Sequence, residues 1–255
     1  MATIIKLLKE KFSETHAMTE SDMKKRLNSF LNEFLNERIF LAGDIIGDYV
    51  YKTISDGDVI LTCTSYESTN FRSKIILGGF LKAYQARKSF KVVIVDFPPR
   101  KEGLEMLRQL SRVGIDCVYI CMNGLSLILP TITKILIPAC SLLLNGAVLA
   151  AVGSAVVAIL GYYYHIPVLV CCETYNFTER AQTNAIVYNE LGDPDDIIDP
   201  HGPNVQSIQN WKENSRITLV NPYYDVIQAE YVTAVLTEMG VIPSSSAPII
   251  LRVKN

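Results

Sequence analysis

The longest uncharged segment of this chain places the strongest limit on its fold. From Ile135 to Cys172, 38 residues pass without Asp, Glu, Lys or Arg. Such a run is typical either of a membrane-spanning helix or of elements buried inside an α/β domain. Pro138, Asn145-Gly146 and Gly153 divide it into pieces that are each short for a membrane span, so we favour the α/β domain. We predict a strand at 135–144, a turn at 145–146, a helix at 147–163 and a strand at 167–172.

Apolar strands and amphipathic helices alternate in the preceding part of the chain. This alternation is the pattern of a parallel sheet with helices packed on it. The predicted strands are 59–63, 91–96 and 116–121, and the predicted helices are 68–87, 102–112 and 126–134. After Cys172 we expect a polar loop at 189–204, a strand at 216–220, a helix at 228–239 and a last strand at 248–253.

The residues before the turn at Asp56-Gly57-Asp58 have a helical pattern. Apolar side chains from Leu27 to Ile39 recur at a spacing of three and four, and no strand-like run interrupts them. We therefore expect a short helical N-terminal region at 1–55 and a Rossmann-like α/β domain with a parallel sheet at 56–255.

Charge and cysteine usage exclude several classes of protein. The net charge of −2, from 24 Lys+Arg and 26 Asp+Glu, argues against direct nucleic-acid binding, which needs a basic face. The six cysteines form no C-x-x-C pair, and with three histidines they give no zinc spacing. We expect buried free thiols, no metal site and a reducing, cytoplasmic location. The first residues lack the pattern of a signal peptide.

The common nucleotide and hydrolase motifs do not occur. No G-x-G-x-x-G follows the first predicted strand, and neither G-x-x-x-x-G-K-[ST] nor G-x-S-x-G is found. These glycine patterns let a backbone approach phosphates or expose a nucleophilic serine. We therefore expect no dinucleotide cofactor and no nucleotide hydrolysis by the chain itself.

Polar residues near the ends of the predicted strands are the candidates for a ligand pocket. Ligands of open parallel sheets bind outside the carboxyl ends of the strands. The competing interpretations are capping for Asp96, a plain turn for Asn145-Gly146, and pairing with backbone amides or an arginine for Glu173. The aspartates from Asp193 to Asp196 do not fit a calcium loop. The candidate pocket residues are Thr62, Thr64, Cys140, Asn145, Gly146, Ser154 and Glu173.

Three segments carry a family resemblance. They are IPVLVCCETYNFTER at 166–180, NELGDPDD at 189–196, and the tail with TEMGVIP at 237–243 and ILRVK at 250–254. Together they resemble the delta-type regulatory subunits of eukaryotic translation initiation factor 2B, over residues 56–254. The resemblance implies a non-catalytic subunit of the guanine-nucleotide exchange factor for initiation factor 2. It would assemble the core with the alpha, beta, gamma and epsilon subunits and sense phosphorylation of the alpha subunit of initiation factor 2.

The same family is similar in fold to methylthioribose-1-phosphate and ribose-1,5-bisphosphate isomerases. Those enzymes use a cysteine and an aspartate to move a proton, and basic residues to hold the phosphate. Here the cysteine position falls on Thr64, and the aspartate position falls on Cys140. The isomerases also have an Asn-Lys pair before a Val-Gly-Thr stretch and an arginine at the end of a strand. Here the pair falls on Ala150-Ala151 and the arginine falls on Pro98. The resemblance thus implies a pseudoenzyme. The alternative is a sugar-phosphate isomerase or a sugar-phosphate-sensing pseudoenzyme.

The resemblance also implies pairing with other subunits through the C-terminal half, as a dimer or a larger oligomer. Aromatic side chains are enriched at such interfaces, although ordinary core packing explains any one of them equally well. The candidate interface residues are Tyr175, Phe177, Tyr188, Asn189, Glu190, Asp193, Asp195 and Asp196.

Overall fold

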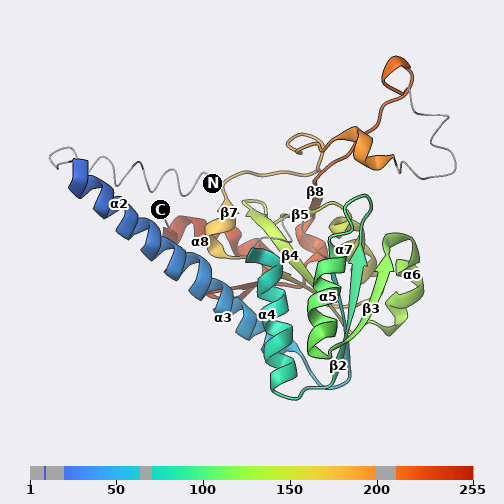
Figure 1. The fold of residues 1–255 in the computed structure, drawn as a ribbon, viewed down its shortest axis with the longest axis horizontal. Coiled ribbons are helices and arrows are strands. Elements are labelled where there is room, and N and C mark those ends of the chain that lie inside the picture. The colour runs from blue at the N-terminus through green and yellow to red at the C-terminus, as the bar shows by residue number, and fades with distance from the viewer. Residues whose placement is uncertain (1–8, 10–19, 64–70, 199–210, 255) are drawn as a thin grey trace.

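A computed structural model describes residues 9, 20–63, 71–198 and 211–254 (Figure 1). Thr64 of the predicted pocket lies outside the described residues. The described chain forms one mixed, mostly parallel sheet with helices on both faces, which confirms the predicted fold class.

The main sheet has the strand order β10-β9-β6-β4-β1-β2-β3. All neighbours in it are parallel except β10, which runs antiparallel to β9. Its inner strands are continuous apolar runs because helices cover both faces. The strands are β1 (Asp58–Cys63), β2 (Phe90–Asp96), β3 (Asp116–Cys121), β4 (Lys134–Leu143), β6 (Val168–Cys171), β9 (Ala234–Thr237) and β10 (Gly240–Ile242).

The uncharged run contains one strand that the sequence did not predict. β4 extends beyond the parallel sheet and turns at Asn145-Gly146 into β5 (Val148–Ala151), which pairs antiparallel with β4 and with β8 (Tyr224–Ile227). The predicted helix at 147–163 is therefore wrong in its first part, and α7 starts at Ser154. A short β7 (Phe177–Thr178) pairs with the end of β4. Within the described residues, no helix is long and apolar enough to cross a bilayer.

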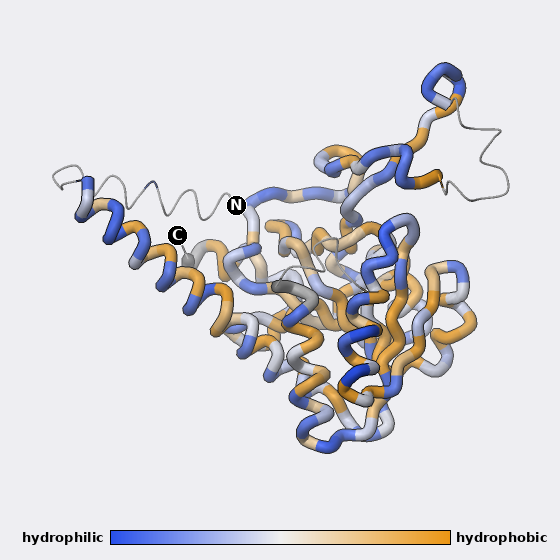
Figure 2. The backbone as a smooth tube through the Cα atoms, in the orientation of Figure 1, coloured by the Kyte–Doolittle hydropathy of each residue, from blue (hydrophilic) through white to orange (hydrophobic). Residues whose placement is uncertain are grey.

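Two layers of helices enclose the sheet. Buried side chains of α3, α4 and α5 pack on one face, and those of α6, α7 and α8 pack on the other. Figure 2 shows hydrophobic residues concentrated on the strands between these layers. The helices are α2 (Glu20–Phe34), α3 (Ala42–Thr53), α4 (Phe71–Gln85), α5 (Gly103–Val113), α6 (Leu125–Ile128), α7 (Ser154–Tyr163) and α8 (Ala247–Lys254). Shorter helical turns are η2 (Met122–Gly124), η3 (Leu129–Thr131), η4 (Thr174–Asn176), η5 (Pro194–Ile197), η7 (Trp211–Glu213), η8 (Ala229–Tyr231) and η9 (Ser244–Ser246).

Residues 20–53 of the N-terminal region form one continuous helical rod. α2 passes through a π-helical turn, η1 (Leu35–Leu41), directly into α3, and α2 extends away from the sheet (Figure 1). α3 approaches α4 closely at Gly79, where a Cβ atom would lie 2.4 Å from Val50 Cγ1. The rod is therefore joined to the sheet domain through a tight α3–α4 contact. The division into 1–55 and 56–255 stays a prediction.

Several predicted elements differ from the structure. Residues 216–220 form no strand. The predicted helix at 228–239 is instead η8, β9 and the turn to β10, and the predicted strand at 248–253 is α8. The predicted helix at 126–134 consists of α6 and the turn η3. Val235 and Leu236 lie fully buried beside β6, so tertiary packing decides the strand conformation there.

Candidate functional site

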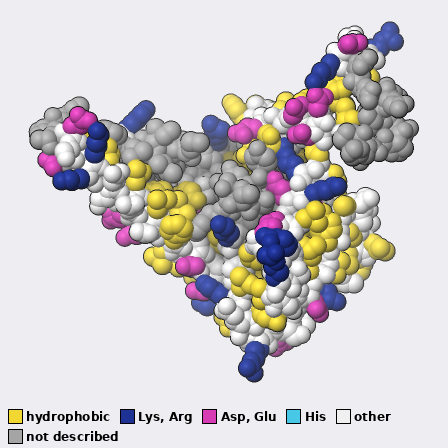
Figure 3. Space-filling view, viewed as in Figure 1, with side chains coloured by type: hydrophobic (Ala, Val, Ile, Leu, Met, Phe, Trp, Pro, Cys, Tyr) yellow, Lys and Arg dark blue, Asp and Glu magenta, His cyan; other side chains and the backbone are white. Residues whose placement is uncertain are grey.

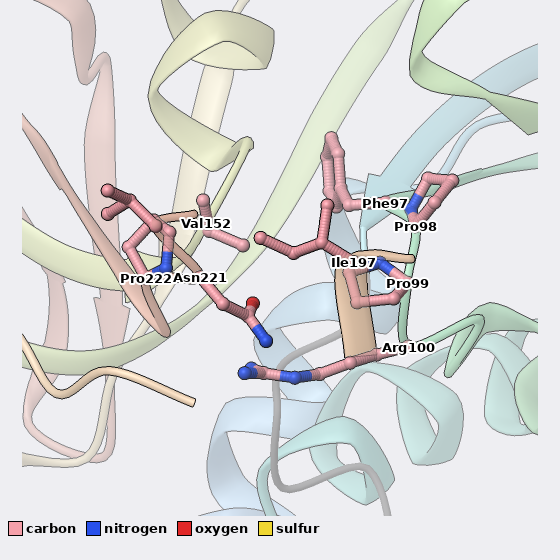
Figure 4. A pocket seen from close by; sticks show the side chains of 9 residues that line it. Phe97, Pro98, Pro99, Arg100, Val152, Ile197, Asn221 and Pro222 are labelled. Atoms are coloured by element: carbon pink, nitrogen blue, oxygen red, sulfur yellow. The ribbon is translucent and has the colours of Figure 1, made fainter. Parts of the chain in front are cut away.

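A hollow of about 260 Å³ lies beyond the carboxyl end of β2. Its walls come from the segment after β2, from Val152 between β5 and α7, and from a protruding arm (Figure 4). We define the arm as residues 189–198 and 211–223; it extends above the sheet in Figure 1. Arg100 and Asn221 provide the polar side chains of a largely apolar lining. The lining residues are Phe97, Pro98, Pro99, Arg100, Val152, Ile197, Val220, Asn221 and Pro222.

Arg100 joins the arm to the sheet domain. Its guanidinium carbon lies 3.5 Å from the centroid of the Tyr223 ring, within cation–π distance. A Cβ atom at Gly192 would lie 2.9 Å from an Arg100 nitrogen, so a side chain there would displace the end of the arginine. Hydrogen bonds hold the arm at its base. The Asn221 amide donates to the Asp193 carbonyl oxygen (2.8 Å), and the Asn189 amide donates to the Tyr224 carbonyl oxygen (2.7 Å).

Two carboxyl groups follow β2 and have different roles. Buried Asp96 accepts hydrogen bonds from the Gly103 amide (2.9 Å) and the Tyr119 hydroxyl (2.7 Å). It thus caps the start of α5, which was the competing interpretation for this residue. Burial raises the pKa of Glu102 to about 7; the Arg100 guanidinium opposes that rise and the Asp96 charge adds to it. Glu102 therefore titrates near neutral pH beside the hollow.

The N-terminus of α7 is occupied by a carboxylate of the chain itself. Asp225 Oδ2 accepts hydrogen bonds from the Gly153 amide (2.6 Å) and the Ala155 amide (3.3 Å). Burial raises the pKa of Asp225, and these two amides oppose the rise. The Phe97 ring covers the same spot, because a Cβ atom at Gly153 would lie 2.3 Å from it. A helix N-terminus binds anions through its free amides, but here Asp225 and Phe97 already fill that position.

The predicted turn at Asn145-Gly146 joins two strands instead of opening a helix. The Asn145 amide donates to the Gln182 carbonyl oxygen (2.8 Å), and the Gly146 amide donates to the Leu143 carbonyl oxygen (2.9 Å). Gly146 has a φ of 79°, which a glycine adopts without strain. Its position near the C-terminal η9, where a Cβ atom would meet the Ser244 carbonyl at 3.0 Å, leaves no room for a side chain.

The other described residues of the predicted pocket do not line the hollow. Thr62 is fully buried on β1, and Ser154 Oγ lies 3.5 Å from Cys63 Sγ with both residues buried. Burial raises the pKa of Cys63 to about 11, so this thiol is protonated at neutral pH and is a poor nucleophile. Cys140, on β4, is half-buried and contributes to that rise.

Glu173, the remaining predicted pocket residue, is buried and pairs locally. Its carboxylate accepts a hydrogen bond from the Asn176 amide (3.0 Å) and one from the Tyr175 hydroxyl (3.5 Å). These two side chains differ from the backbone amides or arginine that the competing interpretation named for Glu173.

The predicted interface residues occupy two environments. Phe177 is buried in the core, and the Tyr175 ring packs edge-on against Phe34 of α2 (6.2 Å between centroids). Tyr188 is exposed beside the arm, with the Arg180 guanidinium 5.7 Å from its ring centroid. Further exposed apolar side chains surround Tyr188: Ile186, Val187 and Leu191.

The acidic residues of the arm are held by turns and one ion pair. Asp193 accepts a hydrogen bond from the Asp195 amide (2.9 Å), while Asp195 accepts one from the Trp211 indole (2.9 Å) and pairs with Lys212. Glu190 and Asp196 are exposed. Within the described residues, no group of three His, Cys, Asp or Glu side chains is arranged to hold a metal ion.

A sequence model of the initiation factor 2 subunit family matches residues 1–244 of this chain. The chain belongs to this family. Among its relatives is the translation initiation factor eIF2B subunit delta of Dictyostelium discoideum, 36% identical over 259 residues. That match covers 99% of this chain and 40% of the relative. The ribose 1,5-bisphosphate isomerase of Pyrococcus furiosus is 30% identical over 207 residues, covering 81% of this chain and 60% of the enzyme.

The fold agrees with a solved structure from the same family. The tetrameric eIF2B-beta2-delta2 complex from C. thermophilum matches with a TM-score of 0.77 and 27% sequence identity. This match covers 93% of our chain and 69% of the matched chain. The chain thus spans between two fifths and three fifths of the length of these curated relatives.

Sequence reasoning missed the residues that shape the hollow. Arg100, Asn221 and Asp225 were not among the candidates, because each meets its partners across distant parts of the chain. Glu102 was also missed, although the charged groups that act on it, Arg100 and Asp96, are close in sequence. Only Arg100 had a local signal, since it closes the Pro98-Pro99 segment directly after a predicted strand.

Proposed function

We propose that this chain is a delta-type regulatory subunit of the guanine-nucleotide exchange factor for initiation factor 2. The observation that carries the proposal is the match to a delta subunit over 99% of the chain, together with the shared fold. The subunit helps to assemble the core of the exchange factor in the cytoplasm, in a complex with two copies of this chain and two of a beta-type subunit. It distinguishes phosphorylated from unphosphorylated initiation factor 2 through contacts with the alpha subunit of that factor, while alpha, gamma and epsilon subunits complete the assembly.

We infer further that the chain is a pseudoenzyme. Proton transfer between sugar carbons needs a titratable acid or base that is ionised near neutral pH, and phosphate needs cations or free amides. In the described site, the Cys63 thiol is protonated and the amides at the start of α7 bind Asp225. By the resemblance stated above, Pro98 stands where the isomerases have an arginine, and Cys140 stands where they have an aspartate. These features support the loss of isomerase chemistry at the positions that the enzymes use. Arg100 and Glu102 lie at the hollow but at other positions of the chain, so turnover of sugar phosphates is tested directly below.

The arm and the segment leading to it are the proposed contact with the beta-type subunit. Exposed Tyr188 and Leu191 lie beside acidic groups of the arm, and aromatic anchors with polar rims are common at protein interfaces. Asn189 and Arg100 fix the base of the arm, so its exposed side chains are presented in one arrangement.

Co-purification with the beta-type subunit of the same organism tests the proposal. We expect the wild-type chain to bind it at low micromolar concentration, and Tyr188→Ala to weaken binding at least ~10-fold, as an interface anchor does. Tyr84→Ala is the matched control, because Tyr84 is an exposed tyrosine on α4, on the opposite side of the sheet from α7. A wild-type chain that stays apart from the beta-type subunit would contradict the assignment.

A sugar-phosphate sensor is the second candidate. The hollow favours it, because the Arg100 guanidinium and the Asn221 amide lie side by side in an otherwise apolar lining (Figure 4). A thermal-shift series with sugar phosphates tests this function. A saturable rise in Tm that is lost in Arg100→Leu would support the proposal that the chain senses sugar phosphates. Turnover of any of these compounds would contradict the proposal that the chain is a pseudoenzyme.

A further inference from the structure

The rod changes its hydrogen-bonding pattern between α2 and α3. The turn η1 is π-helical, so its amides bond to the carbonyl five residues earlier instead of four. A π-helical turn inside an α-helix holds one additional residue; such turns are rare and often lie at functional sites. The backbone is α-helical on both sides of η1, at Phe34 and at Ala42. None of the residues of η1 is buried, so core packing does not fix its hydrogen-bonding pattern.

The α3 side of η1 is held in place. Ile46 and Val50 are fully buried, and a Cβ atom at Gly79 of α4 would lie 2.4 Å from Val50 Cγ1. A rotation of α3 about its own axis would therefore break a close contact between two helices. α2, in contrast, extends away from the sheet (Figure 1). A change in the number of residues that η1 holds therefore turns α2 and leaves α3 where it is.

The sequence of α2 and η1 contains two apolar faces that differ by one residue. Phe30-Leu31 and Phe34-Leu35 are pairs of neighbouring apolar residues, four positions apart. Phe34 is buried, and its ring packs against Tyr175 (6.2 Å between centroids) and against half-buried Phe30 (6.4 Å). Leu31 and Leu35 are exposed, to 38% and 42%. The first member of each pair is thus the more buried one, and the second faces water.

Loss of the π-helical turn would exchange the members of each pair. Neighbouring residues of an α-helix point about 100° apart. If η1 gives up its additional residue and becomes α-helical, each position of α2 passes to the next residue of the sequence. Leu35 then takes the place of Phe34 beside Tyr175. Leu31 takes the place of Phe30 in the same way. We propose that η1 is a register switch, through which α2 moves between the π register of the structure and this α register.

The π register is the major state. Toward the outer end of α2, the α register replaces half-buried Met23 and Leu27 with Lys24 and Asn28, which is unfavourable. Charged side chains of both signs occupy that end of the rod, and hydrophobic side chains follow where the rod nears the sheet domain (Figure 3). The α register regains the regular hydrogen bonds of an α-helix. We therefore expect it as a minor state at on the order of 0.1–10%, reached on the microsecond-to-millisecond timescale of helix register shifts.

The switch changes what the rod presents to a partner. A partner that binds Leu31 and Leu35 requires the π register, and one that binds Phe30 and Phe34 requires the α register. Each shifts the equilibrium by the ratio of its affinities for the two registers. The switch operates in the chain alone, whether or not the arm binds a beta-type subunit.

Deletion of Asn36 tests whether the rod accepts the α register. The deletion removes one residue from η1, so we expect the turn to become α-helical and Tm to stay within about 2 °C of wild type. Deletion of Asp48 is the matched control within the same rod. It turns buried Ile46 out of register with α4 and should lower Tm by more than about 8 °C.

A tryptophan reporter shows which residue faces the domain. Trp211→Phe first removes the single native tryptophan, and Phe34→Trp or Leu35→Trp then places one in the rod. With η1 complete, we expect acrylamide to quench the fluorescence of Leu35→Trp more strongly than that of Phe34→Trp. With Asn36 deleted, we expect the order to reverse, which a general loosening of the rod would not produce.

Methyl NMR of the wild-type chain tests whether both registers are populated. The ring current of Tyr175 shifts the signal of whichever methyl group lies beside it, so the Leu35 methyl signals differ between the registers. Saturation-transfer experiments should reveal a minor state of Leu35 whose chemical shifts equal those in the Asn36 deletion variant. Leu110, which is fully buried on α5, is the control and should show no such exchange.

Three outcomes would overturn the register switch. Deletion of Asn36 that costs as much stability as deletion of Asp48 would mean that the rod requires the π-helical turn. Equal quenching at positions 34 and 35 in the deletion variant would mean that α2 has left the domain instead of turning. A wild-type chain without a minor state at Leu35, or with one whose shifts differ from those of the deletion variant, would mean that only the π register exists.

Discussion

Two neighbouring glycines on α4 should respond to alanine in opposite directions. A Cβ atom at Gly79 would lie 2.4 Å from Val50 Cγ1 and 3.0 Å from the Gly47 carbonyl oxygen of α3. Nothing lies within 4 Å of a Cβ atom at Gly78. Gly79→Ala must therefore push α3 away from α4 or distort Val50, whereas Gly78→Ala meets no obstacle.

The expected size of each effect follows from these contacts. Overpacking a core contact costs about 1–3 kcal/mol, and the short distance to backbone at Gly79 suggests about 3 kcal/mol. Alanine in a helix regains about 1 kcal/mol over glycine, so Gly79→Ala loses about 2 kcal/mol and Gly78→Ala gains about 1 kcal/mol. For a chain of this size, Tm should fall by about 4–8 °C in the first variant and rise by about 2–4 °C in the second.

Thermal and urea unfolding, followed by far-UV circular dichroism, measure both variants against wild type. Each helix keeps its other residues, so the pair isolates the α3–α4 contact from helix propensity. Equal stability of the two variants would refute the reasoning that a tight glycine contact joins the N-terminal rod to the sheet domain.

Three further predictions concern the site. Burial raises the pKa of Glu102 from 4.5 to about 7, so the protonated carboxyl stabilises the fold and that contribution is lost as pH rises from about 4.5 through 7. Urea unfolding at several pH values measures this effect. Relative to Glu102→Gln, the free energy of unfolding of wild type should fall by about 1 kcal/mol over this range, a value reduced for solvent screening because the group is half-buried. Asp225→Ala should cost about 1–2 kcal/mol by uncapping α7, and Asp225→Asn less; equal losses would argue against a capping role. Arg100→Leu should free the arm, lowering the fluorescence anisotropy of the single tryptophan, Trp211, while Tm stays within about 2 °C of wild type; unchanged anisotropy would contradict the anchoring role.

The part of the fold predicted from sequence is the part with unambiguous patterns. The predicted strands 59–63, 91–96 and 116–121 are apolar runs between turn residues, and the structure places β1, β2 and β3 there. The sequence predicts helix for Val148–Ala151, as the start of an Ala-, Gly- and Ser-rich stretch at 147–163. It is a strand because β4 and β8 lie on either side of it with open hydrogen-bonding edges.

The C-terminal elements show the same limit. The segment from Ala229 to Met239 has apolar residues at a spacing that fits a helix, yet Val235 and Leu236 are buried between β6 and β10 as a strand. Short apolar runs of this kind are compatible with either conformation, and only the neighbouring strands decide between them.

The candidate site was predictable in location but not in composition. The hollow lies beyond the carboxyl end of β2, an edge at which open parallel sheets bind ligands, but none of the described candidate residues lines it. The residues that define it meet through long-range contacts: Arg100 stacks on Tyr223, and Asp225 reaches Gly153. No local spacing in the sequence records such pairs.

The most direct test of the proposed function is the rate of GDP release from initiation factor 2. The exchange factor is reconstituted from its other subunits with and without this chain, and the assay uses factor whose alpha subunit is either phosphorylated or unphosphorylated. We predict that the chain co-purifies with the complex and that inhibition by phosphorylated factor requires it. A complex that exchanges GDP and is inhibited equally well without this chain would contradict the account.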